Sequence, residues 1–273
     1  MTTGTDAAQI ERNYFAWLGK RHRPAHGRRT AERHAAFFLP LLTPGMALLD
    51  IGCGPGSITA GLARAVAPGQ SIGLDPDADA LATARTSQDG ANLAFRGGRA
   101  EELPFADASF DAVFAHAVLQ HLDDPAQALR EASRVLRPGG VIGIADADFG
   151  GSIIGPASEP LEQAITLMAS LRRGRGDPFV GSKLGWLLST AGFVDVQAGA
   201  RADLDSGLPT TAFTGAAQAA YFGAPELKAY AATNGLATEA ELDAICEAWE
   251  AWGRTPGAIW ARFWCYATAR RPR

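Results

Sequence analysis

The sequence predicts an α/β fold built on a doubly wound, mostly parallel sheet. Three observations predict it. Between residues 46 and 145, short apolar runs alternate with segments of helical periodicity; the first apolar run ends in a loop of three glycines; and the second ends in an acidic residue, Asp75. Strands that alternate with helices favour parallel pairing through right-handed crossovers, and such sheets bind ligands at the carboxyl ends of their strands.

The first 45 residues predict two helices joined by a basic link. Residues 7–19 carry apolar side chains at helical spacing, and a second helix over residues 30–39 ends before Pro40. The link, residues 20–29, reads KRHRPAHGRR and is interrupted by proline and glycine. Because the chain carries a net charge of −4, we interpret this link as a solvated connection rather than a nucleic-acid contact.

The next hundred residues alternate between the two kinds of element. The expected strands are 46–51, 71–74, 93–95, one that begins within 109–118, and 141–145; the expected helices are 57–67, 77–85 and 124–136. Asp124 and Pro125 are typical of a helix N-cap and the first helical residue.

After residue 150 the alternation ends. The pattern there predicts helices at 160–172 and 182–191, a strand at 193–199, a mainly helical stretch over 208–252, and a last strand at 258–271. Thr238 and Glu241 have the spacing of a capping box.

Composition excludes several classes of protein. The 273 residues are 47% hydrophobic and 20% charged, which is typical of a globular protein that buries its own core. Three scattered cysteines give neither zinc-site spacing nor a disulfide pattern. The N-terminus lacks the pattern of a signal peptide, and no apolar run approaches the roughly 18 residues of a membrane span. We therefore expect a cytoplasmic protein with no metal, no membrane partner and no nucleic-acid partner.

The stretch ALLDIGCGPGS, residues 47–57, carries the strongest signal. Its glycines, Gly52, Gly54 and Gly56, leave a loop without side chains that a ligand can approach closely. A dinucleotide-binding loop would place its third glycine at position 57, where this chain has Ser57, and a phosphate-binding loop with lysine is absent. A tight strand-to-helix turn with no ligand is the structural alternative.

Asp75 is the second signal, because it ends the strand that follows the glycine loop. A carboxylate in this place can accept two hydrogen bonds from a ribose diol. A helix N-cap or an exposed turn carboxylate is the alternative.

Three segments together resemble the class I S-adenosylmethionine-dependent methyltransferases. They are LLDIGCGPGS, GLDPD and the run from GGRAEELPF to VLRPGG, and the resemblance covers about residues 46–146. Within the class they are most similar to the group of enzymes like those of ubiquinone and menaquinone biosynthesis. The resemblance implies a Rossmann-like sheet of seven strands, with residues 258–271 as the one antiparallel strand.

The resemblance also implies a cofactor, S-adenosylmethionine, with S-adenosylhomocysteine as its product, and a set of residues that bind it. The glycine loop would pack against the methionine part, the acid after the second strand would bind the ribose, and later residues would surround the adenine and the methionine side. The residues implied for the methionine part are Asp50, Gly52, Cys53, Gly54 and Gly56, and Asp75 is implied for the ribose. Pro76, Ala100 and Glu101 would lie at the adenine, and His116 and Ala117 on the methionine side.

Two residues are candidates for catalysis, His116 and Asp146. A histidine or a carboxylate near the end of the fourth or fifth strand can take a proton from a methyl acceptor. The alternatives are that His116 only lines the cofactor and that Asp146 and Asp148 are exposed loop carboxylates. His121 is predicted to be a packed structural residue. Methyl transfer is an in-line displacement, so alignment and exclusion of water can suffice.

We expect a single domain in which helices cover the substrate. Its parts are an N-terminal helical lid (1–45), the cofactor-binding core (46–150), two helical insertions over the substrate (151–180 and 205–257), and the rest of the core (181–204 and 258–273). Six residues are predicted to line the substrate: Tyr14, Trp17, Asp146, Asp148, Phe179 and Tyr221. Arg172, Arg173 and Arg175 either bind an acid group of the substrate or lie in a solvated loop.

The predicted function is methyl transfer to oxygen, nitrogen or carbon of a small, largely apolar or aromatic metabolite in a biosynthetic pathway. A homodimer is compatible with the resemblance. The alternative is a protein of this fold that binds the cofactor but catalyses a reaction other than methylation, such as a cyclisation. A nicotinamide-dependent oxidoreductase is disfavoured by the position of Gly56.

Overall fold

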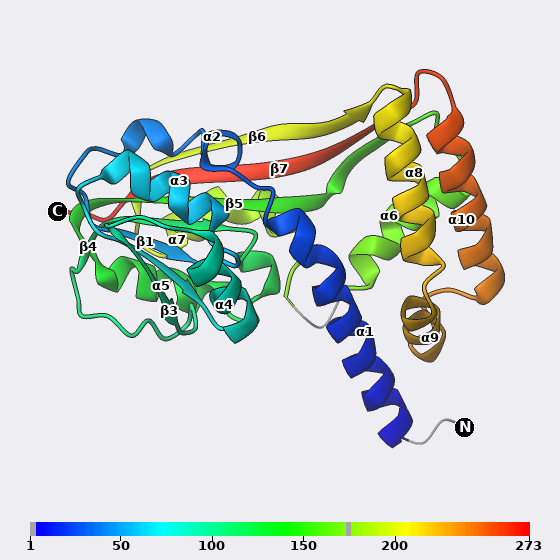
Figure 1. Ribbon diagram of the computed structural model, residues 1–273, viewed down its shortest axis with the longest axis horizontal. Helices are drawn as coiled ribbons and strands as arrows, with labels where there is room; N and C mark the ends of the chain where they lie inside the picture. The colour runs from blue at the N-terminus through cyan, green and yellow to red at the C-terminus, as the bar shows by residue number, and fades with distance from the viewer. Residues whose placement is uncertain (1–3, 173–175) are drawn as a thin grey trace. The chain divides into compact units, whose positions relative to one another are not determined.

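The computed structural model describes residues 4–172 and 176–273 (Figure 1). In chain order the elements are α1 (Gly4–His26), α2 (Ala31–His34), η1 (Leu39–Leu41), β1 (Leu48–Ile51), α3 (Ser57–Val66), β2 (Ser71–Asp75), α4 (Ala78–Ser87), β3 (Leu93–Gly97), β4 (Phe110–His116), η2 (Leu119–His121), α5 (Pro125–Val135), β5 (Leu136–Gly155), α6 (Glu159–Ser170), η3 (Gly181–Lys183), α7 (Leu184–Thr190), β6 (Val194–Ser206), α8 (Leu208–Phe222), α9 (Pro225–Thr233), α10 (Glu239–Arg254) and β7 (Ile259–Arg270).

The strands form one seven-stranded sheet in the order β3-β2-β1-β4-β5-β7-β6. The pairs β1–β2, β1–β4, β2–β3 and β4–β5 are parallel. Strand β7 runs antiparallel to β5 (Figure 1). Near the start of β5, Gly139 and Gly140 exchange backbone hydrogen bonds with Arg271, which directly follows β7, whereas Gly155 at the end of β5 lies beside Ile259 at the start of β7. The predicted fold class is thereby confirmed.

The described residues fall into two compact units. We call residues 23–148, 176–201 and 264–273 the core unit, and residues 4–22, 149–172 and 202–263 the helical unit. Strands β5, β6 and β7 each contribute to both units. The assignment of the whole chain to one domain stays a prediction.

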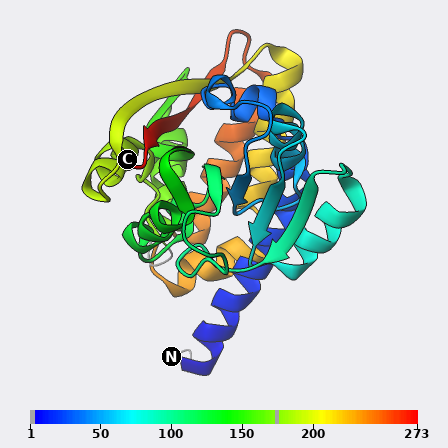
Figure 2. The same cartoon turned by 90° about the vertical axis from the view of Figure 1, so that its left-hand side faces the viewer.

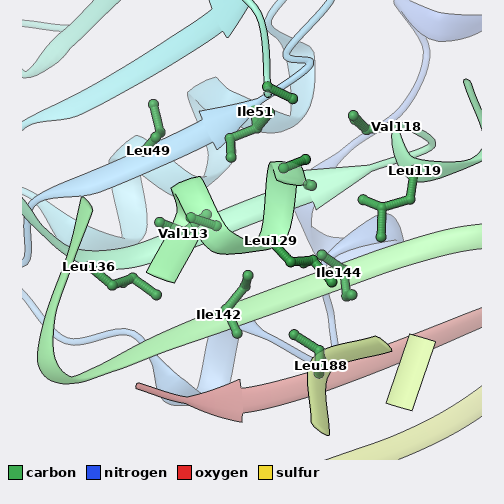
Figure 3. Close-up of a cluster of buried hydrophobic side chains, with 14 of the residues drawn as sticks. Leu49, Ile51, Val113, Val118, Leu119, Leu129, Leu136, Ile142, Ile144 and Leu188 are labelled. Atoms are coloured by element: carbon green, nitrogen blue, oxygen red, sulfur yellow. The ribbon is translucent and has the colours of Figure 1, made fainter. Parts of the chain in front are cut away.

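The core unit has helices on both faces of its part of the sheet (Figure 2). On one face, α5 and α7 cover a large apolar cluster; Figure 3 shows Leu129 of α5 and Leu188 of α7 with Val113 and Ile142 of the strands. On the other face, α2 and α3 cover a second cluster around Phe38 and Phe114. Every residue of β1 is buried, as expected for a central parallel strand.

The helical unit has its own core of aromatic and aliphatic side chains. Trp249 of α10, Trp260 of β7 and Phe222 of α8 are at most 2% exposed. Helices α8 and α10 approach each other closely at two glycines: a Cβ atom built on Gly215 would lie 2.5 Å from the carbonyl oxygen of Trp249 and 2.8 Å from the Cα of Gly253. The capping box predicted for Thr238 and Glu241 is confirmed at the start of α10.

Several predicted boundaries are wrong. Helix α1 continues through residues 20–26, where a broken link was predicted, because lysine and arginine are good helix formers and Pro24 lies only in its last turn. The helix predicted over 30–39 is shortened to α2 and followed by turns and η1. Strands β5 and β6 extend well beyond 141–145 and 193–199, because both lie next to β7, which supplies partners for their backbone groups.

In the described part of the chain, no helix combines the length and the apolar character that crossing a bilayer requires.

Candidate functional site

The glycine loop between β1 and α3 is built from three residues with left-handed backbone. Gly52, Gly54 and Gly56 have φ of +70°, +53° and +77°. A Cβ atom on Gly52 would lie 2.4 Å from Val118, and one on Gly56 would lie 2.6 Å from the ring of Phe95, so both glycines are enclosed by side chains. A Cβ atom on Gly54 would meet nothing within 4 Å. The loop therefore has one position that is open for a ligand.

Asp75, at the end of β2, lies beside that opening. Its Oδ2 accepts a hydrogen bond from the backbone N–H of Gly54 (2.8 Å), and its Oδ1 accepts one from Asp77 (2.8 Å). Burial raises the pKa of this carboxyl. Each oxygen retains a second lone pair, so the carboxylate is fixed in place and can still accept hydrogen bonds from a diol.

Asp50, on β1, connects the strand before the glycine loop to the helix after it. It is 2% exposed and accepts a hydrogen bond of 2.6 Å from the hydroxyl of Thr59 in α3. Burial raises its pKa to about 7, the nearby Asp75 carboxylate adds to the rise, and the Thr59 hydroxyl opposes it. The pair joins the strand before the glycine loop to the helix after it.

The raised pKa of Asp50 predicts a specific dependence of stability on pH. Because the folded state holds the proton more tightly than the unfolded chain, this contribution to stability is complete below the ordinary pKa of 3.8 and is lost as pH rises through 7. We expect the free energy of unfolding of the wild type to fall, relative to that of Asp50→Asn, by roughly 2–3 kcal/mol between pH 5 and pH 8. Urea denaturation at both pH values measures this. Asp89→Asn, which replaces an exposed carboxylate, is the control and should follow the wild type; an Asp50→Asn variant that also follows the wild type would contradict the prediction.

The other residues predicted to bind the cofactor lie at the same edge of the sheet. Cys53 and Ala100 are buried, Glu101 is half-buried and Pro76 is exposed. Burial raises the pKa of the Cys53 thiol. Ala117 has φ of +60° and its N–H donates to the carbonyl of Ala145. Their roles toward a cofactor stay predictions.

His116 ends β4 and is surrounded by aromatic and cationic side chains. Its ring stacks on Trp264 of β7 (centroids 4.6 Å apart) and meets His34 edge to face. Its Nδ1 lies 3.5 Å from a guanidinium nitrogen of Arg29. Burial, assisted by Arg29, His34 and Arg201, holds the pKa of His116 well below its usual value. His116 is therefore neutral at neutral pH.

The acidic candidates at β5 are engaged with the backbone. Asp146 is fully buried and accepts hydrogen bonds from the N–H groups of Leu119 (3.1 Å) and Gln120 (3.5 Å), and burial raises its pKa to about 7. Asp148 is 9% exposed and accepts one from the N–H of Ser182. Both thus anchor loops of the core unit, while a part in binding or catalysis stays a prediction. His121 is exposed, so the prediction of a packed structural histidine is wrong.

The aromatic residues predicted to line the substrate lie in both units. Tyr14, Trp17 and Tyr221 belong to the core of the helical unit, where the phenols of Tyr14 and Tyr221 lie 3.2 Å apart and Trp17 stacks on Tyr221. Phe179 is half-buried in the core unit. Arg172 lies over the ring of Phe149, whereas Arg173 and Arg175 lie outside the described residues.

Sequence reasoning missed the residues around His116 and also missed Thr59, whose hydroxyl donates to Asp50 beside the glycine loop. Arg29 was interpreted as part of a solvated link, yet its guanidinium carbon lies 5.4 Å from the ring centroid of Trp264. Thr59, His34, Trp264 and Arg201 were not singled out. The alternation of the last strand puts Trp264 and Tyr266 on one face, but it does not tell which face of the sheet they share with His116.

Comparison with known proteins gives a consistent result. Residues 49–144, about a third of the chain, match the family model described as methyltransferase domain. The chain is 33% identical over 173 residues to an uncharacterized methyltransferase of Schizosaccharomyces pombe, which covers 60% of this chain and 62% of that protein. It is 33% identical over 174 residues to trans-aconitate 2-methyltransferase of Methylobacterium radiotolerans, with 61% of each chain covered.

Among solved structures, the chain is similar to the YcgJ protein of Bacillus subtilis, with a TM-score of 0.58, 17% identity, and coverage of 89% of this chain and 99% of that one. At this identity the likeness concerns the fold alone. The matched segments span less than two thirds of the length of the curated relatives.

Proposed function

Residues 49–144 form a methyltransferase domain of the class I, S-adenosylmethionine-dependent type, and on this premise we propose that the protein transfers a methyl group from S-adenosylmethionine to a small molecule. The observation that carries the proposal is the open position at Gly54 beside the fixed carboxylate of Asp75. Proteins of this class bind S-adenosylmethionine and S-adenosylhomocysteine.

The residues of the loop fit the chemical groups of this cofactor. Gly54 leaves room for close approach, and the free lone pairs of Asp75 suit a ribose diol. A sulfonium with an adenosine needs no phosphate cradle, and the loop has no lysine to provide one. When bound, the cofactor supplies an electrophilic methyl group.

In this proposal the chain itself contributes position and exclusion of water. Asp50 and Thr59 fix the loop, and Asp75 orients the ribose. His116 is neutral and buried at the end of β4, and together with Ala117 it would line the methionine side. Aligning the methyl donor and the acceptor raises the rate of a displacement of this kind by several orders of magnitude.

The acceptor is proposed to be a small metabolite. This rests on the relatives named for small-molecule methylation, such as trans-aconitate 2-methyltransferase. Membership of the ubiquinone/menaquinone-like group and the nature of the methylated atom stay predictions.

Asp75→Asn tests the cofactor site. The amide keeps the size of the side chain but loses a charged acceptor, which costs about 1.5–3 kcal/mol and predicts a roughly ten- to hundredfold weaker affinity for S-adenosylhomocysteine. Calorimetric titration of wild type and variant measures it. Asp79→Asn, an exposed carboxylate in the first turn of α4, is the matched control and should bind like the wild type.

Two outcomes would contradict the proposal. Absence of binding of both S-adenosylmethionine and S-adenosylhomocysteine to the wild type would exclude the cofactor, and binding of NAD in their place would favour an oxidoreductase. Cofactor binding that Asp75→Asn leaves unchanged would show that the ligand does not use this loop.

A further inference from the structure

The turn that follows β4, residues 117–121, begins with an unusual backbone conformation. Ala117, the residue directly after β4, has φ of +60°, a left-handed value that residues other than glycine rarely adopt. A residue keeps such a conformation only where the surrounding structure imposes it. The N–H of Ala117 donates to the carbonyl of Ala145 on β5 (2.8 Å). Asp146, the next residue of β5, supplies the further contacts that hold this turn.

Both oxygens of the Asp146 carboxyl face the backbone of the turn. Oδ2 accepts a hydrogen bond from the N–H of Leu119 (3.1 Å), and Oδ1 accepts one from the N–H of Gln120 (3.5 Å). The carboxyl is fully buried. Burial raises its pKa to about 7, and the N–H groups of Leu119, Gln120 and Val118 oppose the rise. The carboxyl thus joins β5 to three consecutive residues of the turn.

Val118 connects the turn to the glycine loop. A Cβ atom on Gly52 would lie 2.4 Å from Cγ2 of Val118, so this side chain packs directly against the backbone of Gly52. Gly52 has φ of +70°, and its N–H donates to the carbonyl of Leu74 on β2 (2.7 Å). Gly52 is therefore held from two sides, by β2 through a hydrogen bond and by the turn through Val118. The open position, Gly54, lies two residues further along the same loop.

We propose that Asp146 is a positioning residue for the cofactor-binding loop: its carboxyl fixes the turn after β4, and Val118 on that turn keeps Gly52 in the conformation that binds S-adenosylmethionine. The inference rests on the proposed function, since it assigns a role at the same site. In this role Asp146 contacts neither the cofactor nor the methyl acceptor, and it takes no proton from the acceptor.

Hydrogen exchange of the protein without cofactor tests the connection between the turn and the loop. Asp146→Asn replaces one carboxyl oxygen with an NH2 group, which can only donate, so one of the two backbone N–H groups loses its acceptor. At pH 8 the wild-type carboxyl is ionised. We expect the variant to exchange at least about fivefold faster over residues 117–121 and at least about threefold faster over residues 50–56. A role confined to the turn would leave residues 50–56 unchanged.

The affinity for S-adenosylhomocysteine, measured by calorimetry, is the second readout. We expect it to fall roughly tenfold in Asp146→Asn and roughly fivefold in Val118→Ala. Independent effects would multiply to about fiftyfold in the double variant, whereas we expect about tenfold, because both changes release the same contact with Gly52.

Asp111→Asn is the matched control. Asp111 also accepts a hydrogen bond from a backbone N–H, that of Ala47 (2.8 Å), but it lies at the opposite end of β4. This variant should leave both the exchange of residues 50–56 and the affinity for S-adenosylhomocysteine within about twofold of the wild type.

Three results would overturn the inference. They are exchange over residues 50–56 that Asp146→Asn leaves unchanged, an affinity that this variant leaves unchanged, and effects of Asp146→Asn and Val118→Ala that simply multiply. A wild type that does not bind S-adenosylhomocysteine contradicts the proposed function alone, because the exchange experiment contains no cofactor. Thermal melts establish that the variants fold. Should Asp146→Asn not fold, Val118→Ala decides, and unchanged exchange over residues 50–56 in that variant overturns the inference.

Discussion

Gly54→Val is expected to weaken cofactor binding by more than about a hundredfold at a stability cost of about 1–2 kcal/mol. Gly54 has φ of +53°, and a side chain there would extend into space that no atom within 4 Å fills. A valine would occupy the place where the ligand approaches the backbone. If steric overlap between the valine and the ligand costs about 3 kcal/mol of binding free energy, the affinity for S-adenosylhomocysteine falls by more than about a hundredfold, which calorimetry measures.

The matched control for this experiment is Gly235→Val. Gly235 follows α9 in the helical unit, has φ of +62°, is exposed, and likewise has no atom within 4 Å of the place that a Cβ atom would take. Both variants bear the same cost of about 1–2 kcal/mol for a left-handed β-branched residue. The affinity should fall only in Gly54→Val. Equal affinities in the two variants would mean that the open position at Gly54 is not part of a binding site.

Gly215→Leu is expected to have the largest effect on stability. Helices α8 and α10 meet where Gly215 faces the Trp249 carbonyl and Gly253, and these are backbone atoms that cannot rotate away. A leucine would force the helices apart and expose part of the cluster around Trp249, at a cost of about 3 kcal/mol or more. Urea denaturation followed by tryptophan fluorescence measures the loss, because Trp249, Trp252 and Trp260 all lie in this cluster.

Ala216→Leu on the same helix isolates the cause. Ala216 neighbours Gly215 but is exposed, so the same side chain there meets solvent. We expect its free energy of unfolding to lie within about 0.5 kcal/mol of the wild type. If Gly215→Leu were no more destabilised than Ala216→Leu, the close approach of the two helices would not contribute to the stability of the unit.

The core of the fold could be predicted because its signals are local. The apolar runs, the glycine loop, Asp75 at a strand end and the Asp124–Pro125 helix start each act over a few residues, and the structure has a strand, loop or helix start at each. The lengths of the strands could be predicted less well. How far β5 extends depends on the backbone partners that β7 supplies, more than a hundred residues later in the chain.

The sequence by itself determined the order of elements that leads to the glycine loop, and with it the family of the domain and the residues Asp50, Gly54 and Asp75 at one sheet edge. Only the tertiary structure decided what surrounds His116. Arg29 lies in a segment that resembles a solvated link, Trp264 in the last strand and Arg201 in the one before it, and no spacing relates them. Local patterns specify elements because backbone geometry repeats over a few residues, whereas contacts between distant segments depend on how whole elements pack.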